Sequence, residues 1–305
     1  MISAILSVLL ASLALDLAVA STTNRAPGDT DPDDPEAEEP TGEQPDDETA
    51  PPSAGVTLQG SSDGDWLAGD IGDDALYGAE GADDIFGDLG HDTLDGGEGD
   101  DWLHGDGDYG EPGKDLLIGG RGNDMLAGDG GDDTLLGGPG NDTLMGGSGD
   151  DLLRGGPGNV TLMGHDGDDT LRAGRGESDL TGGAGDDLLI GSDDPSRAWL
   201  HGNEGGDTLV LGDNDFAEGG EGDDLFILPG EPGTTLPVIA DFQAGGDLIE
   251  IRVAYPPGGP VPQLQLDHDS EGMTVIHVDG VALARVVGQG LQANHIVLRN
   301  VIGRA

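Results

Sequence analysis

The sequence predicts an all-β fold, a parallel β-roll in which short strands wind into a flattened coil, with a small antiparallel β cap. Two observations support this prediction. A nine-residue unit repeats in tandem, most clearly from Gly119 to Arg154, where it reads GGRGNDMLA, GDGGDDTLL, GGPGNDTLM and GGSGDDLLR. Such repetition takes precedence over local secondary-structure signals. The composition, with 59 Gly, 3% aromatic residues and no Cys, excludes a bulky core and a disulfide framework.

Each unit encodes a turn followed by a half-strand. Glycine at positions 1 and 4 allows a tight turn with positive φ, and the short run after the Asp at position 6 forms a brief strand. Because side chains alternate along a strand, position 8 points one way and positions 7 and 9 the other. Two units therefore make one coil, with position-8 residues in a thin aliphatic core between two parallel sheets and Asp-rich turns stacked along both edges.

The repeats run from residue 60 to residue 227. Sixteen regular units begin at residues 60, 69, 78, 87, 96, 110, 119, 128, 137, 146, 155, 164, 173, 182, 202 and 219. Position 8 is Leu, Ile or Phe in all of them, from Leu67 to Phe226. Position 6 is Asp in fourteen, namely Asp65, Asp74, Asp83, Asp92, Asp101, Asp115, Asp124, Asp133, Asp142, Asp151, Asp169, Asp187, Asp207 and Asp224. Gly105–Tyr109 is a five-residue insertion, expected to bulge from a turn.

Four units depart from the Asp pattern, and all four fall on one edge of the coil. They contain Val160, Ser178, Ala198 and the short stretch Leu211–Glu218, which shows no recognisable unit. Alternate units lie on opposite edges, and the defective ones all follow residue 154. We therefore expect one edge to be poor in metal beyond Asp142, while the other stays occupied to Asp224.

The formal net charge of −51 makes nucleic acid an unlikely partner, because no basic patch exists. Acidity alone is typical of a soluble or disordered chain. Here, however, carboxylates recur in register at one repeat position, which disorder does not require. Calcium takes six to eight oxygen ligands, including carboxylates and backbone carbonyls, and stacked Asp and Gly turns supply both. One ion for each consecutive pair of Asp residues on an edge gives up to about twelve Ca²⁺.

Three further segments flank the repeats. Residues 1–20 are apolar apart from three Ser and Asp16, and Ala18-Val19-Ala20 has the small-x-small form of a signal-peptidase site. A membrane anchor is the alternative, since about 20 apolar residues can span a bilayer. Residues 21–59, rich in Asp, Glu, Pro and Thr, predict a disordered acidic linker. Residues 228–305 predict a β cap that covers the open coil end.

The cap contains four apolar runs, which we interpret as antiparallel strands. They are Leu264–Leu266, Met273–Val278, Val281–Val287 and His295–Leu298. Asp279-Gly280, between the second and third runs, is a strong hairpin signal.

The unit GGxGxDxUx resembles the calcium-binding repeat of RTX, or hemolysin-type, proteins. Val238–Ile251 resembles the I-x-D-F-x-x-G-x-D-x-I segment that closes such arrays in serralysin-like and other type I secreted proteins. The resemblance implies a right-handed β-roll that folds outside the cell on meeting calcium, with each ion bridging turns two units apart through position-6 Asp carboxylates and turn carbonyls. It also implies export machinery as a partner. The apolar N-terminal segment is unusual for type I substrates, so both that route and a cleaved signal stay open.

No catalytic motif accompanies the repeats. The chain lacks H-E-x-x-H and G-x-S-x-G, and its seven His are scattered and read as exposed polar positions. Trp66, Trp102 and Trp199 hold position 7 and should face outward, too far apart to define a site. Apolar residues at outward positions of one sheet would favour self-association; they are Leu116, Ile118, Leu136 and Leu152.

The function that the sequence predicts is calcium binding by a secreted, extracellular β-roll without catalysis. The alternative is a structural or adhesive cell-surface protein that uses the roll as a calcium-stiffened spacer. A third reading is an enzyme with its site in the cap.

Overall fold

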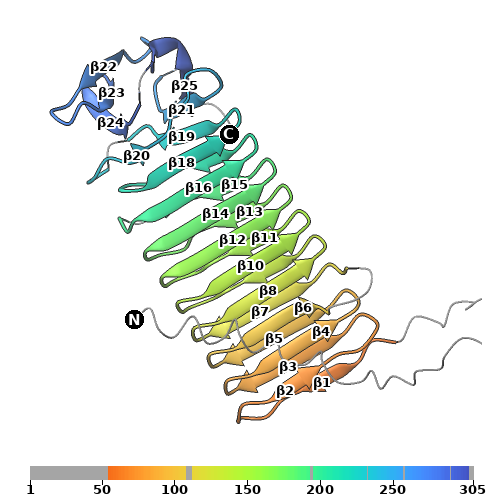
Figure 1. Cartoon of the computed structure of the whole chain (residues 1–305). Coiled ribbons are helices and arrows are strands. Elements are labelled where there is room, and N and C mark those ends of the chain that lie inside the picture. The colour runs from red at the N-terminus through yellow and green to blue at the C-terminus, as the bar shows by residue number, and fades with distance from the viewer. Residues whose placement is uncertain are drawn as a thin grey trace, which may run out of the picture. The chain divides into compact units, whose positions relative to one another are not determined.

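The structure, a computed structural model, describes residues 54–107, 112–192, 195–231, 233–256, 258–288 and 290–301. Every described residue belongs to one compact unit, Thr49–Ala305. The predicted signal or anchor, residues 1–20, and most of the predicted linker lie outside the described residues. Two long parallel sheets form a flattened coil, which confirms the predicted fold class (Figure 1).

The strands alternate between the two sheets along the chain (Figure 1). The first sheet contains β1 (Thr57–Gln59), β3 (Ala75–Glu80), β5 (Thr93–Glu98), β7 (Leu116–Arg121), β9 (Thr134–Leu136), β11 (Leu152–Arg154), β13 (Thr170–Arg172), β15 (Leu188–Ile190), β17 (Thr208–Val210), β19 (Leu225–Pro229), β21 (Leu248–Val253) and β25 (Ile296–Asn300). The second contains β2 (Trp66–Ala68), β4 (Asp84–Asp88), β6 (Trp102–Asp106), β8 (Met125–Gly130), β10 (Thr143–Ser148), β12 (Val160–Asp166), β14 (Ser178–Ala184), β16 (Ala198–Glu204), β18 (Phe216–Glu221), β20 (Val238–Ile239), β24 (Val281–Val286), β23 (Thr274–Val278) and β22 (Leu264–His268).

The core is a single layer of position-8 side chains between the two sheets. Parallel pairing aligns each of them with its counterparts one coil away, as Leu144 pairs with Leu126 and Leu162. The position-8 residues from Leu76 to Phe226 are fully buried, as predicted. The layer is thin because position 1, the next inward position, is almost always glycine. Each coil is therefore stabilised mainly by its two neighbours.

The turns pack too closely to admit side chains at two repeat positions. At position 4, a Cβ added to Gly122 would lie 1.4 Å from the carbonyl oxygen of Gly99 in the coil before it. Position 2 adopts positive φ even where it is not glycine, as at Asp129 (72°) and His165 (83°). Left-handed backbone at non-glycine residues costs free energy, so stacking against adjacent coils must hold these turns.

The predicted insertion lies inside a turn. Gly105 occupies position 1 of its unit, because a Cβ there would meet the Oδ2 atom of Asp115, as position-1 glycines do elsewhere. Pairing resumes in register on both sides, with Trp102 opposite Met125. Residues 108–111 of this turn lie outside the described residues.

The parallel sheets extend beyond both expected limits of the repeats. β1 lies within the segment predicted as linker and pairs with β3. At the other end, β20 and β21 add strands beside β18 and β19. The prediction that residues 295–298 run antiparallel is wrong, because β25 pairs parallel with β21 and so extends the first sheet.

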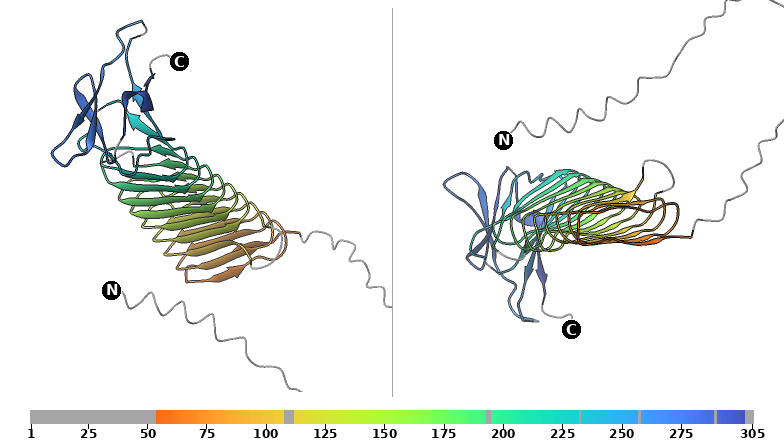
Figure 2. Two further views of the ribbon diagram at one scale, coloured as in Figure 1. Left: turned by 45° about the horizontal axis from the view of Figure 1, so that its top comes forward. Right: turned by 90° about the horizontal axis from the view of Figure 1, so that it is seen from below.

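The antiparallel part of the cap is a three-stranded extension of the second sheet (Figure 2). β22 pairs with β23 and β23 with β24, both antiparallel. The predicted hairpin turn is confirmed, with Asp279 and Gly280 both at positive φ, 52° and 79°, as a tight hairpin requires. β24 pairs parallel with β20, which connects the hairpin to the roll.

We expect Leu144→Asp to divide the roll. Leu144 is fully buried between Leu126 and Leu162, so a carboxyl group there costs at least about 3 kcal/mol and interrupts the stack locally. Thermal unfolding in saturating calcium should change from one transition to two. Thr143→Asp is the matched control, since position 7 faces outward and already holds Asp84 in another unit. A single transition in both variants would contradict the stacked-coil arrangement.

Candidate metal sites

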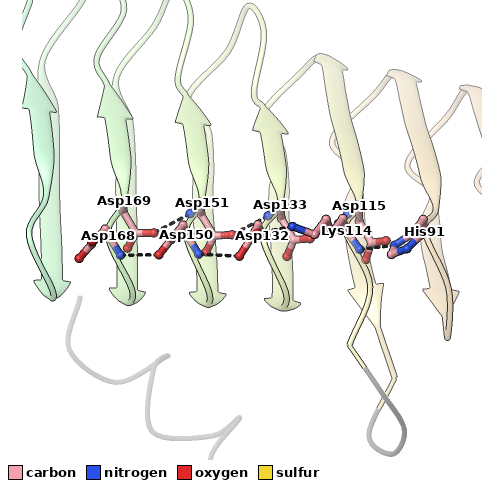
Figure 3. Close-up of polar contacts among 9 residues, drawn as sticks. All are labelled: His91, Lys114, Asp115, Asp132, Asp133, Asp150, Asp151, Asp168 and Asp169. Atoms are coloured by element: carbon pink, nitrogen blue, oxygen red, sulfur yellow. Dashed lines mark hydrogen bonds and ion pairs between the residues drawn. The ribbon is translucent and has the colours of Figure 1, made fainter.

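The structure brings the fourteen predicted Asp residues together in two rows, one along each edge of the coil. The row that precedes the second-sheet strands, here called the Asp65 row, contains Asp65, Asp83, Asp101, Asp124 and Asp142. The row that precedes the first-sheet strands, the Asp74 row, contains Asp74, Asp92, Asp115, Asp133, Asp151, Asp169, Asp187, Asp207 and Asp224. All except Asp65 are at most 3% exposed. Figure 3 shows part of the Asp74 row.

One carboxylate oxygen of each Asp other than Asp65 accepts a backbone N–H from the preceding coil. Oδ1 of Asp169 accepts a hydrogen bond from the backbone N–H of Asp151 at 2.8 Å, and Oδ1 of Asp151 accepts one from Asp133 at 2.7 Å (Figure 3). The same bond recurs along the Asp65 row, where Asp124 donates to Asp142 at 3.0 Å. Every bond of this kind fixes the spacing of two turns.

The other carboxylate oxygen is left without a hydrogen bond. Among the described residues, Oδ2 is buried with no partner in twelve Asp residues, namely Asp83, Asp92, Asp101, Asp115, Asp124, Asp133, Asp142, Asp151, Asp169, Asp187, Asp207 and Asp224. A buried polar atom without a partner costs about 1–3 kcal/mol, more when it is charged. Twelve such atoms in register form a repeated arrangement of oxygens that cations would satisfy.

Each unpaired oxygen shares its space with a backbone carbonyl of the next coil. A Cβ added to Gly78 would lie 2.2 Å from Asp83 Oδ2 and 2.5 Å from the carbonyl oxygen of Gly96. Glycine at position 1 therefore leaves a small space lined by oxygen. The described residues contain no group of three or more His, Cys, Asp or Glu side chains that could hold a metal, so further ligands would be backbone carbonyls. Oxygen-only ligands of this kind fit calcium.

Burial makes these carboxylates hard to ionise without a cation. Burial is the main cause that raises the pKa of Asp133 to about 8; a hydrogen bond from the backbone of Asp115 opposes it, and the neighbouring charges of Asp115 and Asp151 add to it. Burial likewise raises the pKa of Asp169 and Asp187 to about 7. A row of such groups holds protons near neutral pH unless a metal ion replaces them.

Both rows continue beyond the predicted residues. Leu211–Glu218 does form a unit, contrary to the prediction, because Oδ1 of Asp215 accepts the backbone N–H of Ala198 at 2.9 Å and β18 pairs with β16. The fixed nine-residue period missed this unit because its turn is shortened. Asp247, in the segment assigned to the cap, accepts from Asp224 at 3.2 Å. The only sequence signal for it was the Asp-x-aliphatic pattern Asp247-Leu248-Ile249.

The Asp65 row has a gap of three units. Val160, Ser178 and Ala198 align with one another on adjacent strands and provide no carboxylate. The predicted asymmetry is therefore present, but the row resumes at Asp215 instead of ending. Position 1 also changes here, to Ala173, which is 6% exposed. In units with Asp at position 6, a Cβ at position 1 would clash with the Oδ2 atom of that Asp. In this unit position 6 is Ser178, whose shorter side chain leaves room for the methyl group of Ala173.

A second ladder at position 5 was not predicted. The backbone N–H of Asp150 donates to Asp132 Oδ1 at 3.1 Å, and Asp168 donates to Asp150 Oδ1 at 2.9 Å (Figure 3). Its donors lie in the later coil, opposite to the position-6 ladder. Asn141 and Asn123 repeat the arrangement on the other edge at 3.0 Å. The recurrence of Asp or Asn at position 5 was the available signal.

The outward aromatic residues are closer together than predicted. Trp66 and Trp102, 70% and 44% exposed, lie two strands apart on the second sheet. Phe86 lies between them, 6.1 Å from Trp66 between ring centroids, and stacks on His104 at 5.3 Å. His104 also contacts the Asp129 carboxylate at 3.2 Å. Together, Trp66, Phe86, Trp102 and His104 form one exposed aromatic group.

Comparison of the sequence with known protein families agrees with this geometry. Segments 59–94, 77–108, 109–144, 145–180 and 178–194 match the family described as RTX calcium-binding nonapeptide repeat (4 copies). The repeats, the β-roll and the two carboxylate rows agree with this match, and residues 59–194 are RTX, hemolysin-type, repeats.

No curated protein matches the chain. Among solved structures, the extracellular lipase LipA from Serratia marcescens matches 65% of this chain and 42% of that chain, at 18% sequence identity and a TM-score of 0.23. The match thus spans less than half of the lipase. No helix in the described part of the chain is long and apolar enough to cross a membrane.

We expect calcium affinity to rise with pH. Free Asp has a pKa of 3.8, and burial raises that of Asp115 to about 7 and of Asp133 to about 8. Between the free pKa and the raised pKa values, the metal-free roll binds protons that the unfolded chain has lost. The stability of the metal-free roll therefore falls as pH rises through this range. Because calcium competes with those protons, titrations followed by circular dichroism should show weaker binding at pH 5 than at pH 8. Equal affinity at both pH values would contradict the burial of these groups.

Proposed function

We propose that the chain is a secreted, extracellular calcium-binding protein that folds on binding several Ca²⁺ ions and has no catalytic activity of its own. The observation that best supports this proposal is the set of twelve buried Oδ2 atoms without partners. Each faces a glycine and lies near a carbonyl of the next coil. Calcium would satisfy all of these atoms, and no protein group among the described residues does so.

The proposed ligands are the fourteen Asp residues predicted from the sequence, together with turn carbonyls. The twelve unpaired oxygens equal in number the twelve consecutive Asp pairs of the predicted rows, which favours about twelve ions. Asp215 and Asp247 do not add to the twelve unpaired oxygens, because the Oδ2 atom of each accepts a backbone N–H, from Gly212 at 2.7 Å and Gln243 at 2.6 Å, as the Oδ2 atoms of Asp65 and Asp74 at the first coil also do.

Charge explains why folding should require the metal. The formal charge of −51 would fall to about −27 with twelve bound ions. Without them the stacked carboxylates repel one another, and each must lose its hydration on burial. Metal binding thus supplies folding free energy.

We expect the metal-free chain to be largely unfolded at pH 8. Circular dichroism should show mostly coil in excess chelator and a β spectrum in millimolar calcium. Magnesium at the same concentration is the control for ionic strength and should have little effect, since it demands a tighter octahedral site. A folded roll in excess chelator would contradict the proposal.

We expect Val160→Asp to add close to one calcium per chain. Position 1 of this unit is still glycine, Gly155, which leaves room for a carboxylate, and Asp142 in the previous coil has its backbone N–H in register. Thermal stability should rise only when calcium is present. The readout is calcium stoichiometry by equilibrium dialysis.

Two further variants serve as controls for that change. Ser178→Asp should add no ion, because Ala173 fills the space that its Oδ2 atom needs. Asp169→Ala should remove about two ions, those shared with Asp151 and Asp187. Unchanged stoichiometry for Val160→Asp, or an equal gain for Ser178→Asp, would show that the assignment of the row is wrong.

A second candidate is a structural or adhesive cell-surface role with the roll as a calcium-stiffened spacer. The exposed group of Trp66, Phe86, Trp102 and His104 favours it, because aromatic side chains are enriched in binding surfaces. Calcium-dependent binding of the full chain to cells, lost in a Trp66→Ala/Trp102→Ala variant that still binds calcium, would support this role.

A further inference from the structure

The outer face of the first sheet carries a row of side chains with an acid at one end and a base at the other. The row holds position 9 on four adjacent strands, β5, β7, β9 and β11. In strand order it reads Asp95, Ile118, Leu136 and Arg154. We call it the position-9 row.

A second row runs beside the first, two residues earlier on the same strands. This position-7 row reads Thr93, Leu116, Thr134 and Leu152. Both rows lie on the outward face, because the position-8 residue between them is buried on every one of these strands. The four apolar residues that the sequence predicts to favour self-association all belong to these two rows.

The two charges of the position-9 row cannot neutralise each other within one chain. Asp95 and Arg154 lie three strands apart, about 14 Å, which is too far for a direct ion pair. In the described part of the chain, the Asp95 carboxylate has no hydrogen bond or ion pair. Burial raises the pKa of Asp95, so its charge is partly desolvated without compensation.

The basic end of the row is exposed. Arg154 is an exposed residue at the end of β11, where it lines a cavity of about 670 Å³ together with Arg172 and Arg175. The contact proposed here involves Arg154 alone among these three.

We propose that this face binds the same face of a second copy of the chain, with a twofold axis that runs along the strands between β7 and β9. Such an axis reverses the strand order, so β5 of one copy faces β11 of the other. Asp95 then faces the partner's Arg154, and the symmetry makes this contact twice. Sheets that pack face to face lie about 10 Å apart, a gap that an Asp and an Arg side chain span together.

The shapes of the side chains agree with the same axis. Leu116 faces the partner's Thr134, and Leu152 faces the partner's Thr93. Each large side chain of the position-7 row thus lies opposite a small one, which allows the two faces to interdigitate as packed sheets do.

Only this register matches the charges. With the axis between β7 and β9, Ile118 faces the partner's Leu136 and forms an apolar centre. With the axis moved onto β7, Asp95 would instead face the partner's Leu136, which leaves a carboxylate against an apolar side chain. The pattern of the row therefore specifies both the partner and the register.

The interface is small. Neighbouring strands are about 4.8 Å apart, so four strands span about 19 Å, and we expect a transient dimer rather than a permanent one. Each copy has a formal charge of −51, but in about 0.15 M salt repulsion is screened beyond about 8 Å. Direct contacts within the face are screened much less.

The test is sedimentation velocity of the calcium-loaded full chain in about 0.15 M NaCl, over about 1–200 µM to cover micromolar dissociation constants. The sedimentation coefficient should rise with concentration. Asp95→Arg and Arg154→Asp should each weaken self-association at least about tenfold, because each sets like charges opposite each other twice. An equal mixture of the two variants should associate as the unchanged chain does, since every substituted charge then faces an opposite one.

The matched control is Asp84→Arg, which changes the net charge equally at an exposed position of the second sheet and should leave self-association unchanged. Circular dichroism in calcium should show the same β spectrum for all variants, so a failure of calcium-dependent folding is distinguished from a failure to dimerise. A folded chain that stays monomeric, as it would if another segment or another protein covered this face, would overturn the proposal. Failure of the mixture to associate, or an equal loss in Asp84→Arg, would overturn it as well.

Discussion

The whole roll depends on the position-6 carboxylate, whose two oxygens do different things. Oδ1 holds the preceding coil in register through a backbone N–H, and Oδ2 is buried with no donor. The first contact builds the stack, and the second makes it costly until an ion is present. Because both belong to one side chain, ion binding and coil stacking are coupled at each turn that carries this Asp with an unpaired Oδ2.

The repeat period was sufficient to predict the features that depend only on position within a unit. The buried layer from Leu76 to Phe226 and the two Asp rows are of this kind, since alternation and stacking follow from nine-residue spacing. It failed where the spacing changes. Asp215 follows a shortened turn and Asp247 lies 23 residues after Asp224, so only strand pairing in three dimensions aligns them with the rows.

Features that combine different repeat positions also could not be predicted from the sequence. Arg154 and Arg172 hold position 9, whereas Arg175 holds position 3 of a different unit, and only the turn between strands brings them to one cavity. The aromatic group likewise joins position-7 and position-9 side chains from adjacent strands. With the position-6 carboxylates confined to the edges of the coil, the two sheet faces are free to differ: the second sheet carries the aromatic group, and the first carries Arg154 and Arg172 among apolar side chains.

The alanine at position 173 has an evolutionary consequence. Once Ser178 no longer places an oxygen beside position 1, a glycine there is not required, and alanine restricts the unfolded backbone more. An Asp at residue 178 would clash with the methyl group of Ala173, so Ala173→Gly would be needed as well. At Val160 the glycine remains, and a single change suffices. A unit that lacks the carboxylate and has alanine at position 1 needs two substitutions to regain the site, so the gap is easier to widen than to close.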